Sequence, residues 1–191
     1  MRRGLACLLL FLFSTSLVAE AATAKKSSAY VFADQLAKAQ ATNLYPHNKE
    51  EEGVWKKDSL QFPSASTGKE IKIRVLTFNG QTQKGIYFQP IEAAVRRLRF
   101  FKVTPGSKMV IYYGVDDKAA AEPPTANLYL KIYLGQHELR RIQIPNDKGW
   151  KRQEIDLGIA SFLKKGVVVT FELATDSPGP LPFGFWPEIS R

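Results

Sequence analysis

The sequence predicts an all-β protein: an antiparallel jelly-roll β-sandwich with a short N-terminal helix or extended segment. Short stretches alternate apolar and polar residues from residue 54 onward, with the period of two that strands have. Turn residues such as Asn79-Gly80, Pro105-Gly106 and Gly135-Gln136 separate these stretches. No internal repeat is evident, which argues against a propeller or a solenoid. Many short strands with turns between them are typical of two sheets packed face to face.

The first residues have the order of a secretory signal peptide. Arg2 and Arg3 give a positive start, residues 5–13 form an apolar run, and small residues lead to Ala19-Glu20-Ala21, with residues 22–24 as a second cleavage box. The apolar run is too short and too interrupted to span a bilayer. We therefore expect residues 1–21 to be removed and the mature protein to be exported, either to the periplasm or outside the cell.

Composition limits the chemistry of the mature protein. Cleavage removes Cys7, the single cysteine of the 191-residue chain, and with it any disulfide, thiolate nucleophile or cysteine metal ligand. About 165 residues then suffice for one packed core. The full chain carries 27 Lys and Arg against 18 Asp and Glu, a net charge of +9, which favours anionic surfaces such as envelope polymers. The charges are scattered and no nucleic-acid module is recognisable, so we expect no nucleic-acid partner.

Residues 22–53 differ from the rest of the chain and are expected to form a polar or helical N-terminal segment. Apolar residues at helical spacing predict one short amphipathic helix over residues 28–41. These residues are Phe32, Leu36 and Ala39. "PHNKEEEG", residues 46–53, has no periodicity and is interpreted as a solvated loop. The sequence leaves open whether this segment docks on the domain or extends from it.

Residues 54–191 are expected to form the sandwich. "EIKIRVLTF" places Ile71, Ile73 and Val75 on one face of a strand. "NLYLKIYLG" and "VVVTFEL" alternate in the same way, with Tyr, Lys, Thr and Glu opposite the apolar residues. Further strands are predicted at residues 85–90, 96–103, 108–115, 138–144 and 151–157. The brief "IEAAVRR", residues 91–97, is a helix candidate that competes with the start of a strand.

Residues with catalytic or metal-binding chemistry are sparse. The two histidines, His47 and His137, are not clustered with acidic residues at metal-ligand spacing. There is no G-x-S-x-G motif, no P-loop and no G-x-G-x-x-G motif. Carboxylate pairs for glycoside hydrolysis cannot be chosen on spacing alone. We expect a non-catalytic protein without a cofactor or metal site, and a hydrolase is the third-ranked hypothesis.

Aromatic residues are more informative, at 12% of the chain. Exposed Trp or Tyr side chains can stack on the apolar side of a sugar ring, although aromatic residues are more often core. Trp150 and Trp186 are interpreted as core residues, whereas Trp55 follows the polar loop and is expected to be partly exposed. Asp116 and Asp117 follow a strand, where capping of the turn is the favoured role and calcium binding the alternative.

Six short motifs follow one another along residues 54–190: "KGIYFQP" (84–90), "YYGVDDKA" (112–119), "LKIYLGQHEL" (130–139), "EIDLG" (154–158), "VVVTFELATD" (167–176) and "FGFWPEI" (183–189). Together they resemble the galactose-binding-domain-like jelly roll, most closely the NPCBM-type carbohydrate-binding modules attached to glycoside hydrolases. The resemblance implies a jelly-roll sandwich and a carbohydrate ligand. The sequence departs from that pattern at Gln89, where the family has His, at Leu134, where it has Asp, and in lacking an acidic cluster before the terminal Trp. These departures remove support for the family's own sugar or calcium site.

The leading hypothesis is an exported, non-catalytic binding protein that recognises a carbohydrate or an anionic cell-envelope polymer. Loops on a rigid scaffold are where such sites concentrate. The candidate ligand-binding residues flank strand ends or interrupt the apolar alternation: Trp55, Asp116, Asp117 and Arg140. The alternative is a structural or assembly component of the envelope that binds a protein partner through residues 22–53 or through an exposed sheet face.

Overall fold

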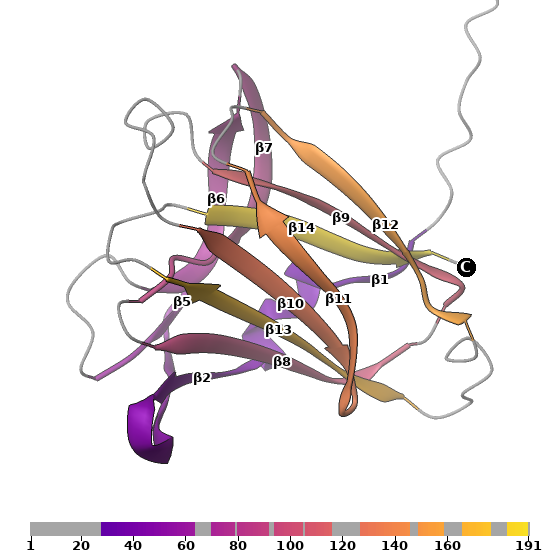
Figure 1. The fold of residues 1–191 in the computed structure, drawn as a ribbon. Coiled ribbons are helices and arrows are strands. Elements are labelled where there is room, and N and C mark those ends of the chain that lie inside the picture. Colours follow the sequence, from indigo (N-terminus) through magenta and orange to yellow (C-terminus); the bar gives the residue numbers. More distant parts are fainter. Residues whose placement is uncertain are drawn as a thin grey trace, which may run out of the picture.

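Two antiparallel sheets pack face to face, which confirms the predicted sandwich (Figure 1). The computed structural model describes residues 28–63, 70–78, 80–91, 94–104, 106–115, 127–145, 149–158, 166–176 and 183–190. The predicted signal peptide lies outside these residues. No helix within the described ranges is long and apolar enough to cross a membrane.

Sheet A has eight strands, and all of its pairings are antiparallel. Its order is β12 (Lys151–Asp156), β9 (Lys108–Val115), β14 (Phe183–Ser190), β7 (Gln81–Tyr87), β6 (Ile71–Phe78), β5 (Ser59–Gln61) and β4 (Val54–Lys56), with β1 (Ser28–Val31) also beside β14.

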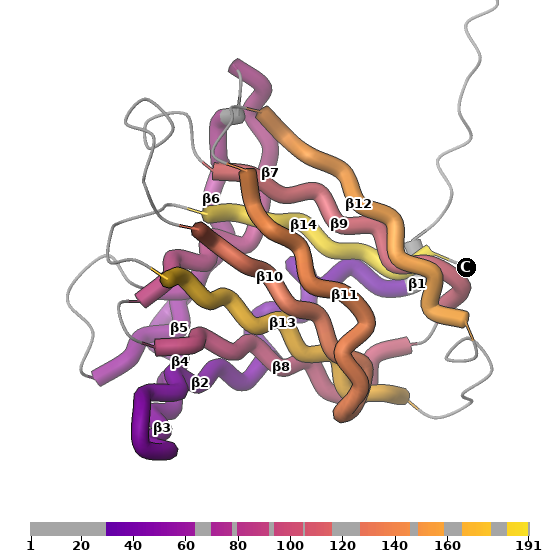
Figure 2. Tube along the Cα trace, in the orientation of Figure 1, coloured from indigo at the N-terminus to yellow at the C-terminus, as the bar shows by residue number. Residues whose placement is uncertain are grey.

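Sheet B has six strands, again antiparallel throughout. Its order is β11 (His137–Ile144), β10 (Leu128–Leu134), β13 (Val167–Thr175), β8 (Val95–Val103), β2 (Gln40–Tyr45) and β3 (Lys49–Glu52). The chain passes repeatedly between the two layers, for example from β8 in sheet B to β9 in sheet A and back to β10 (Figure 2). Each sheet therefore pairs strands that are distant in sequence.

The core lies between the sheets and is rich in phenylalanine. Phe32 contacts Phe100 and Phe171 edge-on, with ring centroids 5.0 and 5.2 Å apart, and Phe171 contacts Phe185 at 5.1 Å. All four side chains are buried. Edge-to-face pairs of this kind add specific geometry to the burial of apolar surface. The alternation predicted for β10 and β13 is confirmed along most of both strands, where the apolar residues are fully buried: Leu128, Leu130, Ile132, Val169, Phe171 and Leu173. Leu134 and Val167, at the strand ends, are half-buried.

The N-terminal segment docks on the domain, and it is mostly extended rather than helical. Helical residues are confined to a six-residue 3-10 helix, η1 (Ala33–Lys38), so the longer helix predicted for residues 28–41 is wrong. Strands β1 and β2 flank η1 and join sheets A and B respectively. Phe32 and Leu36 are buried as the helical spacing suggested, but the tertiary pairing of β1 and β2 overrides helix propensity at both ends.

The predicted loop at residues 46–53 is also wrong. A short 3-10 helix, η2 (Pro46–Asn48), leads into β3, which pairs with β2 at the edge of sheet B. The polar run could not show this pairing, because an exposed edge strand needs no apolar alternation. Residues 28–52 are therefore built into the sandwich.

The candidate helix at residues 91–97 is a strand start instead. Ile91 and Ala94 form an isolated bridge, and β8 begins at Val95. The neighbouring Arg96 is fully buried, which places a charged residue on the inner face of sheet B.

The hairpin of β6 and β7 projects at the top of the view in Figure 1. Ile71 is buried at its base, but Ile73 is 38% and Val75 60% exposed. The opposite face of the hairpin is covered, since Leu76 and Tyr87 pack under Trp150. Gly85 lies against the same residues: a Cβ there would be in ordinary contact with Trp150 Cη2 at 3.5 Å and slightly too close to Leu76 Cδ1 at 3.3 Å.

Candidate binding groove on sheet B

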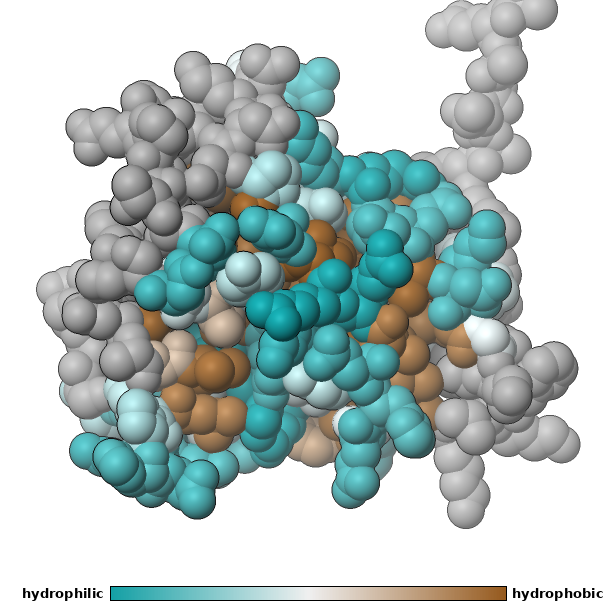
Figure 3. Space-filling view, viewed as in Figure 1, coloured by the Kyte–Doolittle hydropathy of each residue, from teal (hydrophilic) through white to brown (hydrophobic). Residues whose placement is uncertain are grey.

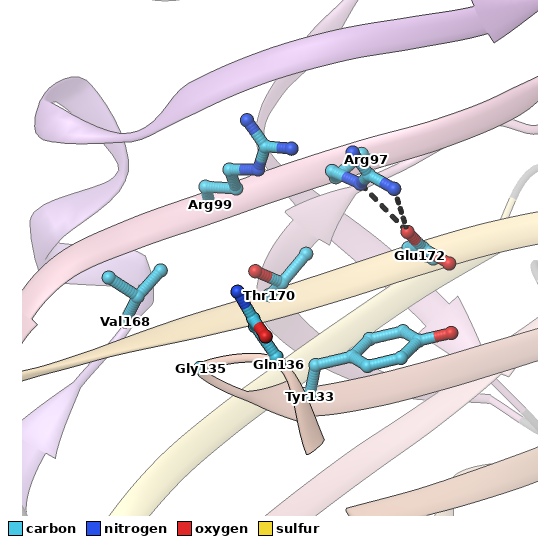
Figure 4. A pocket seen from close by; sticks show the side chains of 8 residues that line it. All are labelled: Arg97, Arg99, Tyr133, Gly135, Gln136, Val168, Thr170 and Glu172. Atoms are coloured by element: carbon cyan, nitrogen blue, oxygen red, sulfur yellow. Dashed lines mark hydrogen bonds and ion pairs between the residues drawn. The ribbon is translucent and has the colours of Figure 1, made fainter. Parts of the chain in front are cut away.

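An open groove of about 560 Å³ lies on the outer face of sheet B. Its lining comes from β8, β13, β10 and the turn after β10 (Figure 4). The lining residues are Arg97, Arg99, Tyr133, Gly135, Gln136, Val168, Thr170 and Glu172. The surface is thus mixed, with two guanidinium groups, a phenol ring, an amide, a hydroxyl and a carboxylate.

Strand alternation places these side chains on the outer face. In β8, Leu98 and Phe100 are buried in the core, so Arg97 and Arg99 point to the other side of the sheet. The same holds in β13 for Thr170 and Glu172, which alternate with buried apolar residues. The register then aligns residues across strands. Arg97 lies opposite Glu172, and Arg99 lies opposite Thr170.

One end of the groove is closed by an ion pair. Arg97 donates from Nε at 2.7 Å and from Nη2 at 2.6 Å to the same oxygen, Oε1, of Glu172 (Figure 4). Glu172 is only 8% exposed, so the pair is partly withdrawn from water. Two charge-assisted hydrogen bonds on one oxygen hold both side chains in place.

Tyr133 joins this cluster through its hydroxyl. The hydroxyl donates to Glu138 Oε2 at 3.3 Å, and its ring points toward Glu172 in Figure 4. Partial burial, followed by the charges and hydrogen bonds of Glu172 and Glu138, raises the pKa of Tyr133 to about 12. The phenol is therefore neutral at any physiological pH.

Arg99 is in a different electrostatic situation from Arg97. It is half-buried, and its cross-strand neighbours are the neutral residues Gln40 and Thr170. Within the described part of the chain, Arg99 makes no ion pair or hydrogen bond through its guanidinium. The groove therefore holds one neutralised and one unneutralised arginine, two residues apart on the same strand.

The rim of the groove is a tight hairpin turn between β10 and β11. Gly135 takes a φ of +59°, and its N–H donates to Val168 O at 2.8 Å. A positive φ at the first position of a two-residue turn strongly favours glycine. Gln136 follows it and presents an exposed amide to the groove.

The cationic surface continues past the groove onto β11, the edge strand. Lys131 lies opposite Glu172 on one side and opposite Arg141 on the other. The Arg141 guanidinium carbon sits 4.2 Å above the ring centroid of Tyr129. Figure 3 shows hydrophilic side chains gathered over β10 and β11 on this face of the molecule.

The site residues predicted from the sequence are not brought together. Trp55 lies on β4 of sheet A, where its ring packs against the core and its Nε1 donates to Ala39 O at 3.1 Å. Arg140 is exposed on β11 of sheet B, at the opposite edge of the sandwich. Asp116 and Asp117 lie outside the described residues. All four remain predictions as ligand-binding residues.

The structure also shows where the other two tryptophans lie and whether acidic or histidine side chains cluster. Trp150 and Trp186 are half-buried, Trp150 over the β6–β7 hairpin and Trp186 against the main core. Among the described residues, no group of three or more His, Cys, Asp or Glu side chains could hold a metal ion.

No family model matches the sequence, and no curated protein matches it. Solved structures that are similar include a CBM51 module of Clostridium perfringens ZmpB in complex with GlcNAc, with 11% identity and a TM-score of 0.42 over 78% of this chain and 32% of that chain. A second structure, of CBM51-2 and INT domains from ZmpB, has 11% identity and a TM-score of 0.41 over 81% of this chain and 41% of that chain. The chain thus spans less than half of these two structures.

Two further neighbours are matched over almost their whole length. The CBM51 module from Clostridium perfringens GH95, in complex with methyl-galactose, has 16% identity and a TM-score of 0.41 over 66% of this chain and 94% of that chain. The adhesin domain of Lys-gingipain from Porphyromonas gingivalis has 11% identity and a TM-score of 0.44, over 78% and 96%. Carbohydrate-binding β-sandwiches, which the sequence resembles, are thus among the similar structures. At TM-scores this low, the likeness gives no residue of this chain a role.

Proposed function

We propose that this protein is an exported, non-catalytic binding protein that holds a carbohydrate chain in the groove on sheet B. The observation that carries this proposal is the lining of the groove, in which an aromatic ring lies beside guanidinium, amide and hydroxyl groups. Sugar rings offer apolar C–H faces to aromatic side chains and hydroxyl groups to polar ones. A site that combines both suits them.

The open shape of the groove supports a polymer rather than an enclosed small molecule. The groove lies on an exposed sheet face, and polar side chains continue from it onto β11. A chain can therefore enter and leave along the surface without a terminal group being recognised. Strands position the lining side chains rigidly, which limits the ordering cost on binding.

Binding without turnover is supported by the state of Glu172. This carboxylate, the one that lines the groove, is engaged by two nitrogens of Arg97. Paired-acid hydrolysis requires a second carboxyl group across the scissile bond. We therefore assign Glu172 to the positioning of Arg97 and Tyr133.

Docking of a protein partner through residues 22–53 is less favoured. Residues 28–52 supply strands to both sheets, and Phe32 and Leu36 are buried in the core. Deleting this segment would remove part of the core, so such a deletion cannot separate partner binding from folding.

The test is retention on a panel of immobilised polysaccharides, with a basic protein of similar net charge as reference. Tyr133→Ala removes the aromatic surface of the groove and is expected to weaken binding roughly five- to ten-fold. Tyr112→Ala is the matched control, because Tyr112 is also half-buried on a strand but belongs to sheet A. Retention no greater than that of the reference protein, or equal losses in both variants, would contradict the proposal.

A further inference from the structure

The cations on the face of sheet B are not balanced by the acids beside them. The register forms one row across four strands, in the order Arg97, Glu172, Lys131 and Arg141. Glu172 is the single acid among these four residues and is bound by Arg97. On the other side of Arg97 the row continues through Thr42 to Glu52, on the edge strand β3. The neighbouring row adds Arg99, whose cross-strand neighbours Gln40 and Thr170 are neutral. The acid of that row, Glu138, lies three strands away and is bound by Tyr133.

This arrangement is unfavourable for an isolated fold. Lys131 and Arg141 are directly opposite each other, and like charges in that position destabilise a sheet. Within the described ranges, neither Lys131 nor Arg99 forms an ion pair or hydrogen bond through its side chain. Arg99 is also half-buried, so water compensates its charge less completely than at a fully exposed site. An anionic ligand would reduce the repulsion between Lys131 and Arg141 and would supply a counter-charge for Arg99.

We propose that the groove selects acidic polysaccharides, with Arg99 as the residue that contacts the acidic group. This inference rests on the proposed function and names the class of glycan that the groove takes. A guanidinium presents a planar fork of N–H donors that matches a carboxylate or sulfate oxygen pair. Thr170 and Gln136, which line the groove beside Arg99, supply hydrogen bonds to sugar hydroxyls.

Lys131 and Arg141 are placed to contact further acidic groups of the same polysaccharide chain. Neighbouring strands are about 4.8 Å apart, so the row from Arg97 to Arg141 spans about 14 Å. The Arg141 guanidinium lies over the Tyr129 ring, 4.2 Å from its centroid, and this cation–π contact limits the motion of the side chain. A repeating acidic chain that contacts Arg99 in the groove would therefore meet Lys131 and Arg141 further along the same face.

The experiment compares Arg99→Gln with Arg152→Gln by titration at fixed ionic strength. Arg152 is an exposed arginine on β12 of sheet A, so its substitution removes the same charge from the protein outside the groove. The probes are polygalacturonate, dextran sulfate, and two neutral chains, dextran and methyl-esterified polygalacturonate. We expect Arg99→Gln to weaken binding of the acidic chains at least ten-fold, and Arg152→Gln to change it less than two-fold. Arg99→Gln should not lower the thermal unfolding temperature, because Arg99 has no ion pair or hydrogen bond to lose among the described residues.

Other results of this experiment would contradict the inference, the proposed function or both. Equal losses in the two variants would mean attraction by net charge alone and would overturn the inference, as would equal binding of neutral and acidic chains. Tight binding of neutral chains that is unaffected by Arg99→Gln would overturn the inference while leaving the proposed function intact. Failure to bind any of these four chains would overturn the inference, and failure to bind any polysaccharide of the wider panel would overturn the proposed function as well. A preference for polygalacturonate over dextran sulfate, or the reverse, identifies the acidic group.

Discussion

Single residues of β8 show how similar side chains acquire different roles. Arg96 is fully buried, donates from Nε to Asn43 Oδ1 at 3.2 Å and from Nη1 to Gln89 O at 2.9 Å, and lies 4.7 Å from the Phe62 ring centroid. Burial lowers the pKa of Arg96 to about 10, partly offset by Tyr45 and Glu51, so the group still carries its charge at neutral pH. It is a structural residue, whereas Arg99, three residues on, faces the groove.

Tyr133 makes the stability of the protein depend on pH at the alkaline end. Its pKa is about 12 in the folded state, against an ordinary value of 10.0, so the unfolded chain loses this proton first. Stability from this group is complete below pH 10 and falls as the pH rises toward 12. We expect the urea midpoint of the wild type to fall more steeply than that of Tyr133→Phe over this range, as followed by tryptophan fluorescence. Parallel curves for the two proteins would contradict the placement of Tyr133 beside Glu172 and Glu138.

The sequence indicated part of this site at the residue level. "RRLRFFKV" alternates Arg97 and Arg99 with Leu98 and Phe100, so the outward direction of both arginines follows from the pattern. The residues that lie beside the two arginines cannot be predicted from this pattern. Strand β13 lies some seventy residues further along the chain, and only the fold brings Glu172 opposite Arg97. The site predicted from loops at strand ends therefore overlooked a groove formed by the middle of a sheet.

At the level of elements, alternation predicts a strand better than it predicts burial. The boundaries of β9 agree with the sequence prediction because its apolar residues have a sheet to face: Met109, Ile111 and Tyr113 are all buried. Strand β6 has the same alternation, yet Ile73 and Val75 are exposed because the β6–β7 hairpin projects from the rest of the fold (Figure 1). Burial depends on what covers a face, which a local pattern does not contain.

Substitutions in β6 test this difference directly. Val75→Thr should change the free energy of unfolding by less than about 0.5 kcal/mol, because Val75 is 60% exposed. Leu76→Ala, one residue further, should lower it by about 2–3 kcal/mol, because Leu76 is buried under Trp150. Urea unfolding of both variants measures the two values. Swapped magnitudes would mean that the hairpin has the opposite face against the fold.

For the molecule as a whole, the N-terminal residues are part of the sandwich and not an appended segment. The described residues start in sheet A with β1, cross to sheet B through η1, and pair β2 with β8, the strand that carries the groove arginines. The N-terminal residues therefore support β8, the strand that carries two residues of the candidate groove. A segment with weak strand signals in the sequence supports the strand on which the candidate site depends.

The prediction at this scale concerns Phe32, which lies between the two sheets. Phe32→Ala should lower the free energy of unfolding by about 3–5 kcal/mol, because the ring is fully buried against Phe100 and Phe171. Asp34→Ala is the control, because Asp34 lies in η1, which starts directly after Phe32, and is exposed. Its effect should be within about 0.5 kcal/mol. Denaturant unfolding of the whole chain provides the measurement. If Phe32→Ala were as mild as the control, residues 28–52 would be an appendage, and the protein-docking role for this segment would regain its support.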